Sequence, residues 1–110
     1  MKYRFLFFLI FFLALFSCAG QRKQVIKVPI GYGHRLFSLG LYEEAAFHYR
    51  MILQRDSLSS EEKAKVLNNL AVIHEMKEEY LKAREMYREA LETDSNVEIY
   101  ENYKRFMGGL

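Results

Sequence analysis

The sequence has few of the residues that covalent cross-links and metal sites need. Its single cysteine, Cys18, excludes an intramolecular disulfide framework and any zinc site built from several cysteines. No excess of one charge is present either, since 16 lysines and arginines stand against 14 acidic residues. This balance argues against the basic footprint of a nucleic-acid-binding protein. A length of 110 residues leaves room for one small domain, which excludes the usual two-domain enzyme.

The N-terminal segment differs in composition from the rest of the chain. Lys2 and Arg4 form a short basic start, and residues 5–16 are all apolar. A membrane-spanning helix needs about 20 apolar residues, so a run this short is typical of a cleavable signal peptide. We therefore expect residues 1–17 to be a signal peptide that is followed by a chain of ordinary soluble composition.

The cysteine follows this apolar run directly. Leu15-Phe16-Ser17-Cys18 resembles the lipobox of bacterial lipoproteins, with an aliphatic residue three positions before the cysteine and a small residue next to it. The resemblance implies that Cys18 receives a diacylglycerol thioether, that the preceding segment is removed and that the new amine is acylated, for example with palmitate. Several acyl chains anchor stably because each buried methylene contributes about 0.8 kcal/mol. A buried core cysteine and an uncleaved signal anchor are the alternative interpretations.

The same resemblance implies a place in the cell. A lipid anchor on Cys18 would hold the protein in the bacterial cell envelope, and Ala19, which is not aspartate, favours the outer membrane facing the periplasm under the sorting rule of enteric bacteria. Residues 18–29 end at the single proline and have no helical period, so we expect an extended tether. Its basic residues either rest on anionic headgroups or belong to a solvated spacer.

An internal repeat organises the rest of the chain. At an offset of 38 residues, residues 42–57 align with residues 80–95, and seven of the sixteen positions are identical. Part of this identity recurs at helical spacing as one stripe in each copy: Tyr42, Ala45, Tyr49 and Leu53, then Tyr80, Ala83, Tyr87 and Leu91. A second helical pattern precedes each stripe, so each copy is a predicted helix-turn-helix unit.

The ends of these helices carry recognisable signals. Gly40 can end the helix predicted over residues 30–39 in a left-handed conformation. Ser59 to Glu62 form a capping box at the start of a helix over residues 61–77, and Ser95 to Glu98 are expected to open the last helix. The helix over residues 61–77 is apolar over most of its circumference, so it must be sandwiched between other helices.

These helices resemble the tetratricopeptide repeat (TPR) family, whose first helix carries a large residue, Leu-Gly and Tyr and whose second carries Ala and an aromatic residue. The residues that carry this resemblance are Gly33, Gly40, Tyr42, Ala45 and Tyr49 in the first copy and Leu67, Leu70, Ala71, Tyr80, Ala83 and Tyr87 in the second. It implies an all-α fold over residues 30–107, with repeats at about 30–57 and 61–95 and a capping helix at 96–107.

The first helices of TPR arrays line a concave groove that takes an extended peptide or a partner helix. Carried over to this sequence, that groove consists of His34, Phe37, Lys65, Asn68, Asn69, Val72, Glu75 and Met76. Asn69 matches an asparagine of family members that grip a C-terminal carboxylate. The basic positions of that clamp hold other residues here, namely Ile30, His34, Ile99 and Tyr103, which argues against that specific activity. Core packing is the alternative role for Phe37 and Met76.

The sequence holds no recognisable catalytic or metal motif. His34, His48 and His74 do not stand at metal-ligand spacing, and we expect His48 on a helix flank and His74 in the core. Acidic clusters such as Glu43-Glu44 are expected to be solvated helix faces. We therefore predict a protein that is not an enzyme and takes no cofactor, metal, nucleic acid or small-molecule substrate.

The array is short, since about three stacked repeats are normally needed for stability. The chain has two, followed by a helix with apolar residues on more than one side: Val97, Ile99, Tyr100, Tyr103, Phe106 and Met107. We expect this helix to pack on the second repeat and to offer apolar surface to a partner or a second copy.

The sequence thus predicts a lipid-anchored adaptor or assembly factor for another envelope protein. A structural homo-oligomer and an accessory subunit of an envelope enzyme complex are the alternatives.

Overall fold

The structure is a computed structural model that describes residues 30–110. This part of the chain folds into five helices and no strand: α2 (Ile30–Ser38), α3 (Tyr42–Leu53), α4 (Ser60–Met76), α5 (Tyr80–Thr93) and α6 (Val97–Gly108). The prediction of an all-α fold with two helix pairs and a final helix is confirmed. The predicted signal peptide, the lipidation site Cys18 and the tether lie outside the described residues.

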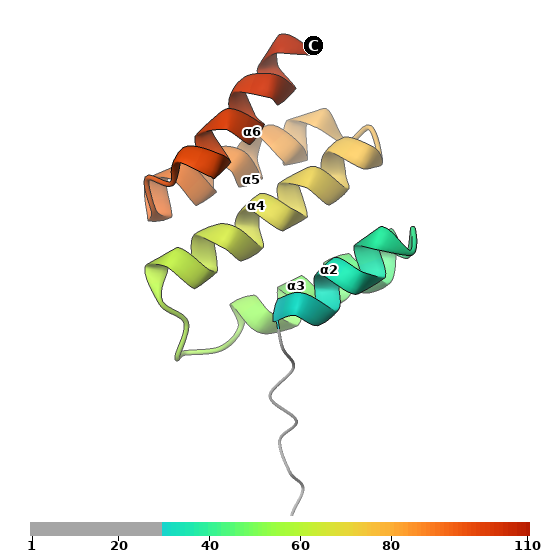
Figure 1. Ribbon diagram of the computed structural model, residues 1–110, viewed down its shortest axis with the longest axis vertical. Coiled ribbons are helices and arrows are strands. Elements are labelled where there is room, and N and C mark those ends of the chain that lie inside the picture. Colours follow the sequence, from blue (N-terminus) through green and yellow to red (C-terminus); the bar gives the residue numbers. More distant parts are fainter. Residues whose placement is uncertain (1–29) are drawn as a thin grey trace, which may run out of the picture.

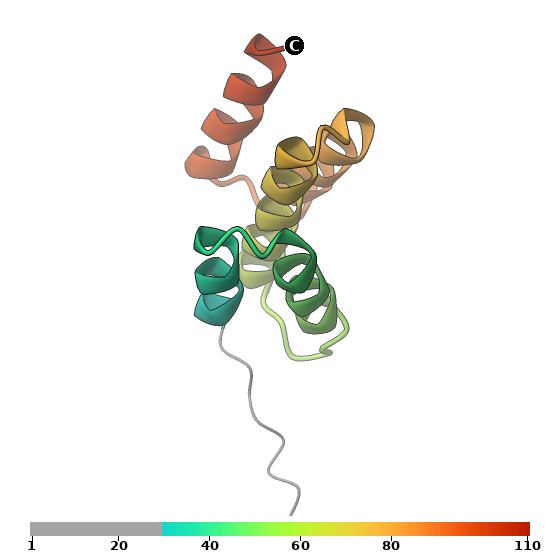
Figure 2. The ribbon, with the colours of Figure 1, turned by 90° about the vertical axis from the view of Figure 1, so that its right-hand side faces the viewer.

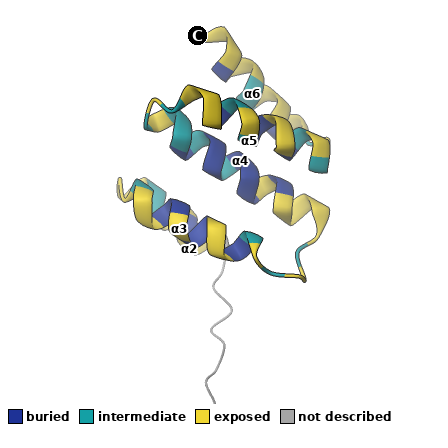
Figure 3. Ribbon diagram, turned by 180° about the vertical axis from the view of Figure 1, so that it is seen from behind, coloured by how far each residue is buried: buried dark blue, intermediate teal, exposed yellow. Residues whose placement is uncertain are grey.

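The helices form a short stack. The pair α2–α3 lies at one end, the pair α4–α5 in the middle and α6 at the other end, as Figures 1 and 2 show from two sides. Helix α4 contacts α3, α5 and α6, and Figure 3 shows how much of it is buried. The prediction that this helix is sandwiched is therefore confirmed, and its buried residues are Ala64, Val66, Leu67, Asn68, Leu70, Ala71 and Ile73. None of the helices from residue 30 onward combines the length and apolar content that crossing a bilayer requires.

The two helix pairs turn in the same way. Gly40, between α2 and α3, has a φ of 75°, and Glu78, at the equivalent position between α4 and α5, has a φ of 60°. Both values lie in the left-handed region, which glycine adopts without a steric penalty and which costs other residues about 1–2 kcal/mol. The predicted left-handed end at Gly40 is confirmed, and the second repeat makes the same turn with a strained glutamate.

The start of α4 is capped as predicted. The Ser59 hydroxyl accepts from the Glu62 backbone N–H at 3.1 Å, and the Glu62 carboxylate accepts from the Ser59 backbone N–H at 2.9 Å. The expected cap of the last helix at Ser95 is wrong by one residue. Asn96 is the cap there, and its side-chain oxygen accepts from the Glu98 backbone N–H at 2.8 Å, so that α6 begins at Val97.

The repeat residues pack where the helices come closest. Ala45 and Tyr49 lie in a core shared by α3 and α4, and Ala83 and Tyr87 lie in a second core with Phe106 of α6. The Tyr87 and Phe106 ring centroids are 5.4 Å apart, so α6 packs on the second repeat as expected.

At Gly33, α2 and α3 approach each other closely. A Cβ at this position would lie 2.6 Å from the Tyr49 ring. The prediction that neighbouring His48 lies on a helix flank is wrong, because the α2 helix covers it and its ring stands edge-on to Tyr32 at a centroid distance of 5.2 Å. A glycine at position 33 lets α2 approach α3 closely enough to bury the rings of His48 and Tyr49.

Candidate functional site

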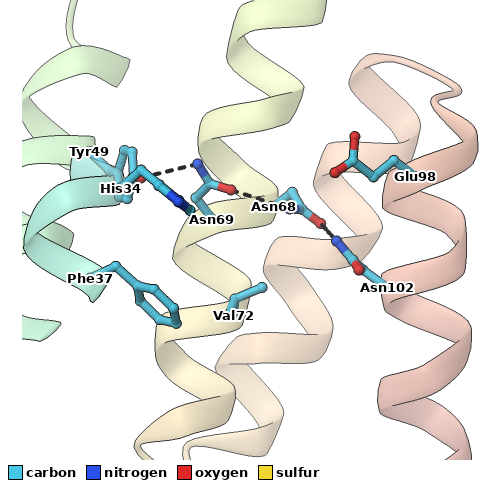
Figure 4. A pocket seen from close by; sticks show the side chains of 8 residues that line it. All are labelled: His34, Phe37, Tyr49, Asn68, Asn69, Val72, Glu98 and Asn102. Carbon is cyan, nitrogen blue, oxygen red and sulfur yellow. Dashed lines mark hydrogen bonds between the residues drawn. The ribbon is translucent and has the colours of Figure 1, made fainter. Parts of the chain in front are cut away.

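A cleft of about 230 Å³ opens on the side of the stack that α2, α4 and α6 share. Figure 4 shows its eight lining side chains, which come from these three helices and, in one case, from α3. They are His34, Phe37, Tyr49, Asn68, Asn69, Val72, Glu98 and Asn102. No residue of α5 lines the cleft, so it lies on the face formed by the first helix of each pair and by α6.

Five of the eight residues predicted for a groove line this cleft: His34, Phe37, Asn68, Asn69 and Val72. The other three lie elsewhere. Lys65 is exposed and pairs with Glu61 at 2.6 Å, an ion pair that raises the pKa of the lysine. Glu75 and Met76 line a separate pocket near the C-terminal end of α6. The Glu75 carboxylate accepts there from the Tyr87 hydroxyl at 3.0 Å, which ties α4 to α5.

A continuous row of polar side chains crosses the cleft. Asn69 Nδ2 donates to the Tyr49 hydroxyl at 3.1 Å, and Asn68 Nδ2 donates to Asn69 Oδ1 at 3.3 Å. Asn102 Nδ2 in turn donates to Asn68 Oδ1 at 3.1 Å, and Arg105 continues the row with a 3.2 Å bond to Asn102 Oδ1. The row, visible from Tyr49 to Asn102 in Figure 4, connects α3, α4 and α6.

The amides in this row keep hydrogen-bonding capacity. A primary amide has two N–H donors and an oxygen with two lone pairs. Asn68, Asn69 and Asn102 each donate one bond and accept one bond within the row. Asn68 is buried, whereas Asn69 and Asn102 are half-buried, so these two have a second donor and a second acceptor position with which to bind another molecule. An extended polypeptide presents alternating N–H and C=O groups, which match this pairing of donors and acceptors.

The rest of the cleft is partly apolar and carries a negative charge at one side. Phe37 and Val72 are half-buried and supply apolar surface, whereas Glu98 is exposed. Burial raises the pKa of the Tyr49 phenol, although the bond from Asn69 opposes this shift. Tyr49 therefore stays neutral at physiological pH and serves as a hydrogen-bonding group.

A second polar cluster lies at the turn between α4 and α5, outside the cleft. Lys77 pairs with Glu43 of α3 and, at 3.2 Å, with Glu79. Glu79 also meets His74 Nδ1 at 2.6 Å, and these partners, His74 first, lower the pKa of Glu79 to about 2. His74 was expected in the core but is half-buried and held by this carboxylate. The cluster connects the two helix pairs, which indicates a structural role.

Three cleft residues were absent from the predicted groove: Tyr49, Glu98 and Asn102. For Tyr49 the repeat pattern predicts only a structural role. Asn102 stands 34 residues after Asn68, which is the usual TPR period, so alignment at that offset would have placed both asparagines at equivalent positions. Alignment at 38 residues, the offset of the longer first repeat, hid this relation. Within the described part of the chain, no group of three or more His, Cys, Asp or Glu side chains is placed to hold a metal ion.

Comparison with known families finds a match in the middle of the stack. Residues 64–97 match the family model of the tetratricopeptide repeat. The match covers most of α4, all of α5 and the turn that follows. No curated protein and no solved structure matches the chain.

The matched TPR segment contributes Asn68, Asn69 and Val72 to the cleft. Arrays of such repeats use their concave surfaces to bind other proteins. The cleft lies on the face formed by α2, α4 and α6, and the family match thus supports a role in protein–protein interaction.

Proposed function

We propose that this protein is a lipid-anchored adaptor or assembly factor of the bacterial cell envelope, which holds an extended segment of another envelope protein in the α2–α4–α6 cleft. The observation that carries the binding role is the polar row from Tyr49 to Asn102, because it crosses three helices and its half-buried amides, Asn69 and Asn102, offer paired donors and acceptors. Phe37 and Val72 beside this row offer apolar contacts to the partner's side chains.

The chemistry of the cleft favours a polypeptide over a small molecule. Small-molecule sites are usually concave pockets of about 300–1,000 Å³ that bury most of their ligand. The cleft here has about 230 Å³, which is below that range, and it is only partly enclosed. A polypeptide can extend beyond such a cleft and gain contacts along α2 and α6.

The envelope location rests on the sequence of the N-terminal segment, where the lipobox-like Leu15-Phe16-Ser17-Cys18 follows a basic and apolar signal. Acylation at Cys18 would place the helical domain at the periplasmic face of the outer membrane. Metabolic labelling with radioactive palmitate tests this assignment. We expect the wild-type protein to be labelled and to be found in the membrane fraction. Cys18→Ser should be unlabelled and absent from that fraction. Equal labelling of the two proteins would contradict it.

The binding role is tested by chemical cross-linking in the native membrane. His34 is exposed and lines the cleft, so His34→Trp fills the cleft without burying a new group in the core. Leu81→Trp on α5 is the matched control, because Leu81 is exposed and lies outside the cleft. We expect a discrete cross-linked partner with the wild type and Leu81→Trp and its loss with His34→Trp. Retention of that partner by His34→Trp would contradict the proposal.

A further inference from the structure

Both ends of the helical stack expose large apolar side chains. At the α2–α3 end, Phe47 is 60% exposed, and Tyr32 and Met51 are also exposed. At the α6 end, Val97, Tyr100 and Met107 are exposed. Terminal repeats of a solenoid normally carry a polar outer face, which keeps the array soluble. At both ends of this stack, large apolar side chains are exposed among the polar ones.

The exposed residues of the first end form a groove between α2 and α3, which we name the end groove. It has a volume of about 580 Å³ and is lined by Tyr32, Leu36, Glu43, Glu44, Phe47, His48 and Met51. No residue of α4, α5 or α6 lines it. The end groove is therefore mostly apolar, carries two carboxylates, and is distinct from the cleft that binds the proposed partner.

Four exposed residues of the last helix form a stripe, which we name the α6 stripe: Val97, Tyr100, Lys104 and Met107. Their spacings of three, four and three residues put them on one face of a helix. The buried residues Ile99 and Phe106 lie on the opposite side, against α4 and α5. The α6 stripe thus has the form of a ridge with one lysine among apolar side chains.

The charges of the two surfaces are complementary. Glu43 pairs with Lys77 of its own chain, whereas no ion pair within residues 30–110 involves Glu44 or Lys104. Packing one α6 stripe on another would bring two lysines together, and packing two end grooves together would bring carboxylates together. Such like-charge contacts are unfavourable, whereas an α6 stripe in an end groove brings Lys104 to Glu44.

We propose that the α6 stripe of one copy docks in the end groove of a second copy, so that the protein self-associates head to tail. The helices that carry the two surfaces, α2 with α3 and α6, lie at opposite ends of the stack in Figures 1 and 2, so the two surfaces cannot meet within one chain. A contact between two different surfaces is heterologous and continues from copy to copy, as an open chain or a closed ring. This inference does not depend on the proposed function, because the end groove and the cleft share no residue.

The test uses the full-length protein in detergent and measures its protein mass against concentration by light scattering. Phe47→Ser removes an anchor from the end groove, and Tyr100→Ser removes one from the α6 stripe. Both side chains are more than half exposed, so neither change opens a core cavity. Leu81→Ser is the matched control, since Leu81 is 75% exposed and belongs to neither surface.

We expect the wild type and Leu81→Ser to exceed the mass of two copies as concentration rises, and each of the other variants to lose affinity about tenfold or more. A mixture of Phe47→Ser and Tyr100→Ser should stop at two copies, because one intact stripe then meets one intact groove. A second arm exchanges the charges. Glu44→Lys and Lys104→Glu should each weaken association, and the double variant should restore it.

Three results would overturn the proposal. The first is a wild type with the mass of one copy at every concentration. The second is dimerisation of Phe47→Ser or Tyr100→Ser alone with wild-type affinity, which indicates a symmetric interface. The third is an equal loss of association in Leu81→Ser. Circular dichroism spectra of all variants show whether a loss of mass comes from unfolding.

Discussion

Among the glycines of residues 30–110, Gly33 is the one at which an added methyl group meets the closest neighbours. In Gly33→Ala, the new Cβ would lie 2.6 Å from both Cε1 and Cζ of Tyr49 and 3.0 Å from Cδ2 of His48. Carbon atoms pack at about 3.5–4.0 Å, so either the Tyr49 ring or the α2 backbone must move by roughly 1 Å. Tyr49 is 1% exposed and packs in the core between α3 and α4, so a shift of its ring disturbs close-packed neighbours.

The cost of this displacement has two parts. Overpacking of a close-packed core destabilises by about 1–3 kcal/mol. Movement of Tyr49 also lengthens its 3.1 Å hydrogen bond to Asn69, and a bond of this kind contributes about 1 kcal/mol. For a domain of this size, each kcal/mol corresponds to about 4–8 °C in Tm. These two parts sum to about 2–4 kcal/mol, of which alanine in a helix recovers about 0.5–1 kcal/mol relative to glycine. We therefore expect a net loss of about 1–3.5 kcal/mol and a Tm lowered by roughly 4–28 °C for Gly33→Ala.

Thermal unfolding followed by circular dichroism measures this effect, and the chain provides a matched control. Gly31 lies in the same helix, and a Cβ there would meet no heavy atom within 4 Å. Gly31→Ala should therefore stabilise the protein by about 0.5–1 kcal/mol, because alanine loses less conformational entropy than glycine in a helix. In a Tyr49→Ala background, Gly33→Ala should cost little, since the ring is gone. An unchanged or raised Tm for Gly33→Ala would refute the packing described for α2.

Three further predictions concern the second repeat. Ala83 is fully buried, so Ala83→Leu should destabilise by about 1–3 kcal/mol through overpacking, measured by urea unfolding, and a wild-type midpoint would contradict the pairing of α4 with α5. Glu78→Gly should stabilise by about 1 kcal/mol in the same assay, because Glu78 has a φ of 60°, and a lower midpoint would count against strain at this turn. The pKa of Glu79 lies at about 2 in the folded protein, below the ordinary 4.5, mainly through His74, so the ionised carboxylate stabilises the fold above pH 4.5 and this contribution is lost as pH falls towards 2. Glu79→Gln should therefore lose less Tm than the wild type between these pH values, and parallel losses would show that the cluster contributes nothing.

Most of the helical architecture was predictable because it depends on residues close to one another in the sequence. The stripe containing Ala83 and Tyr87 repeats at helical spacing, and the Ser59–Glu62 box signals a helix start by hydrogen bonds within four residues. Gly40 likewise ends its helix through its own backbone preference. The incorrect prediction of Ser95 as the N-cap of α6 also has a local cause. Asn96, one residue later, is an equally good capping residue and is the N-cap in the structure.

The candidate site was harder to predict because it depends on contacts between distant segments. Asn68 and Asn69 were identified from their place on a first helix, but their bonds to Asn102 and Tyr49 join residues that are 34 and 20 positions apart. The burial of His48 also results from tertiary packing, since α2 covers it from outside its own helix. Neither relation has a signal in the periodicity of a single helix.

The central claim, that the α2–α4–α6 cleft binds another envelope protein, is tested most directly by site-specific photo-cross-linking in living cells. A photoreactive amino acid replaces His34 at the cleft in one strain and Leu81 outside it in another, both at exposed positions. The account predicts one discrete adduct from position 34 with a protein other than this chain, its loss when Asn69→Ala and Asn102→Ala are added, and no such adduct from position 81. An equal adduct from both positions, or none from position 34, would contradict it.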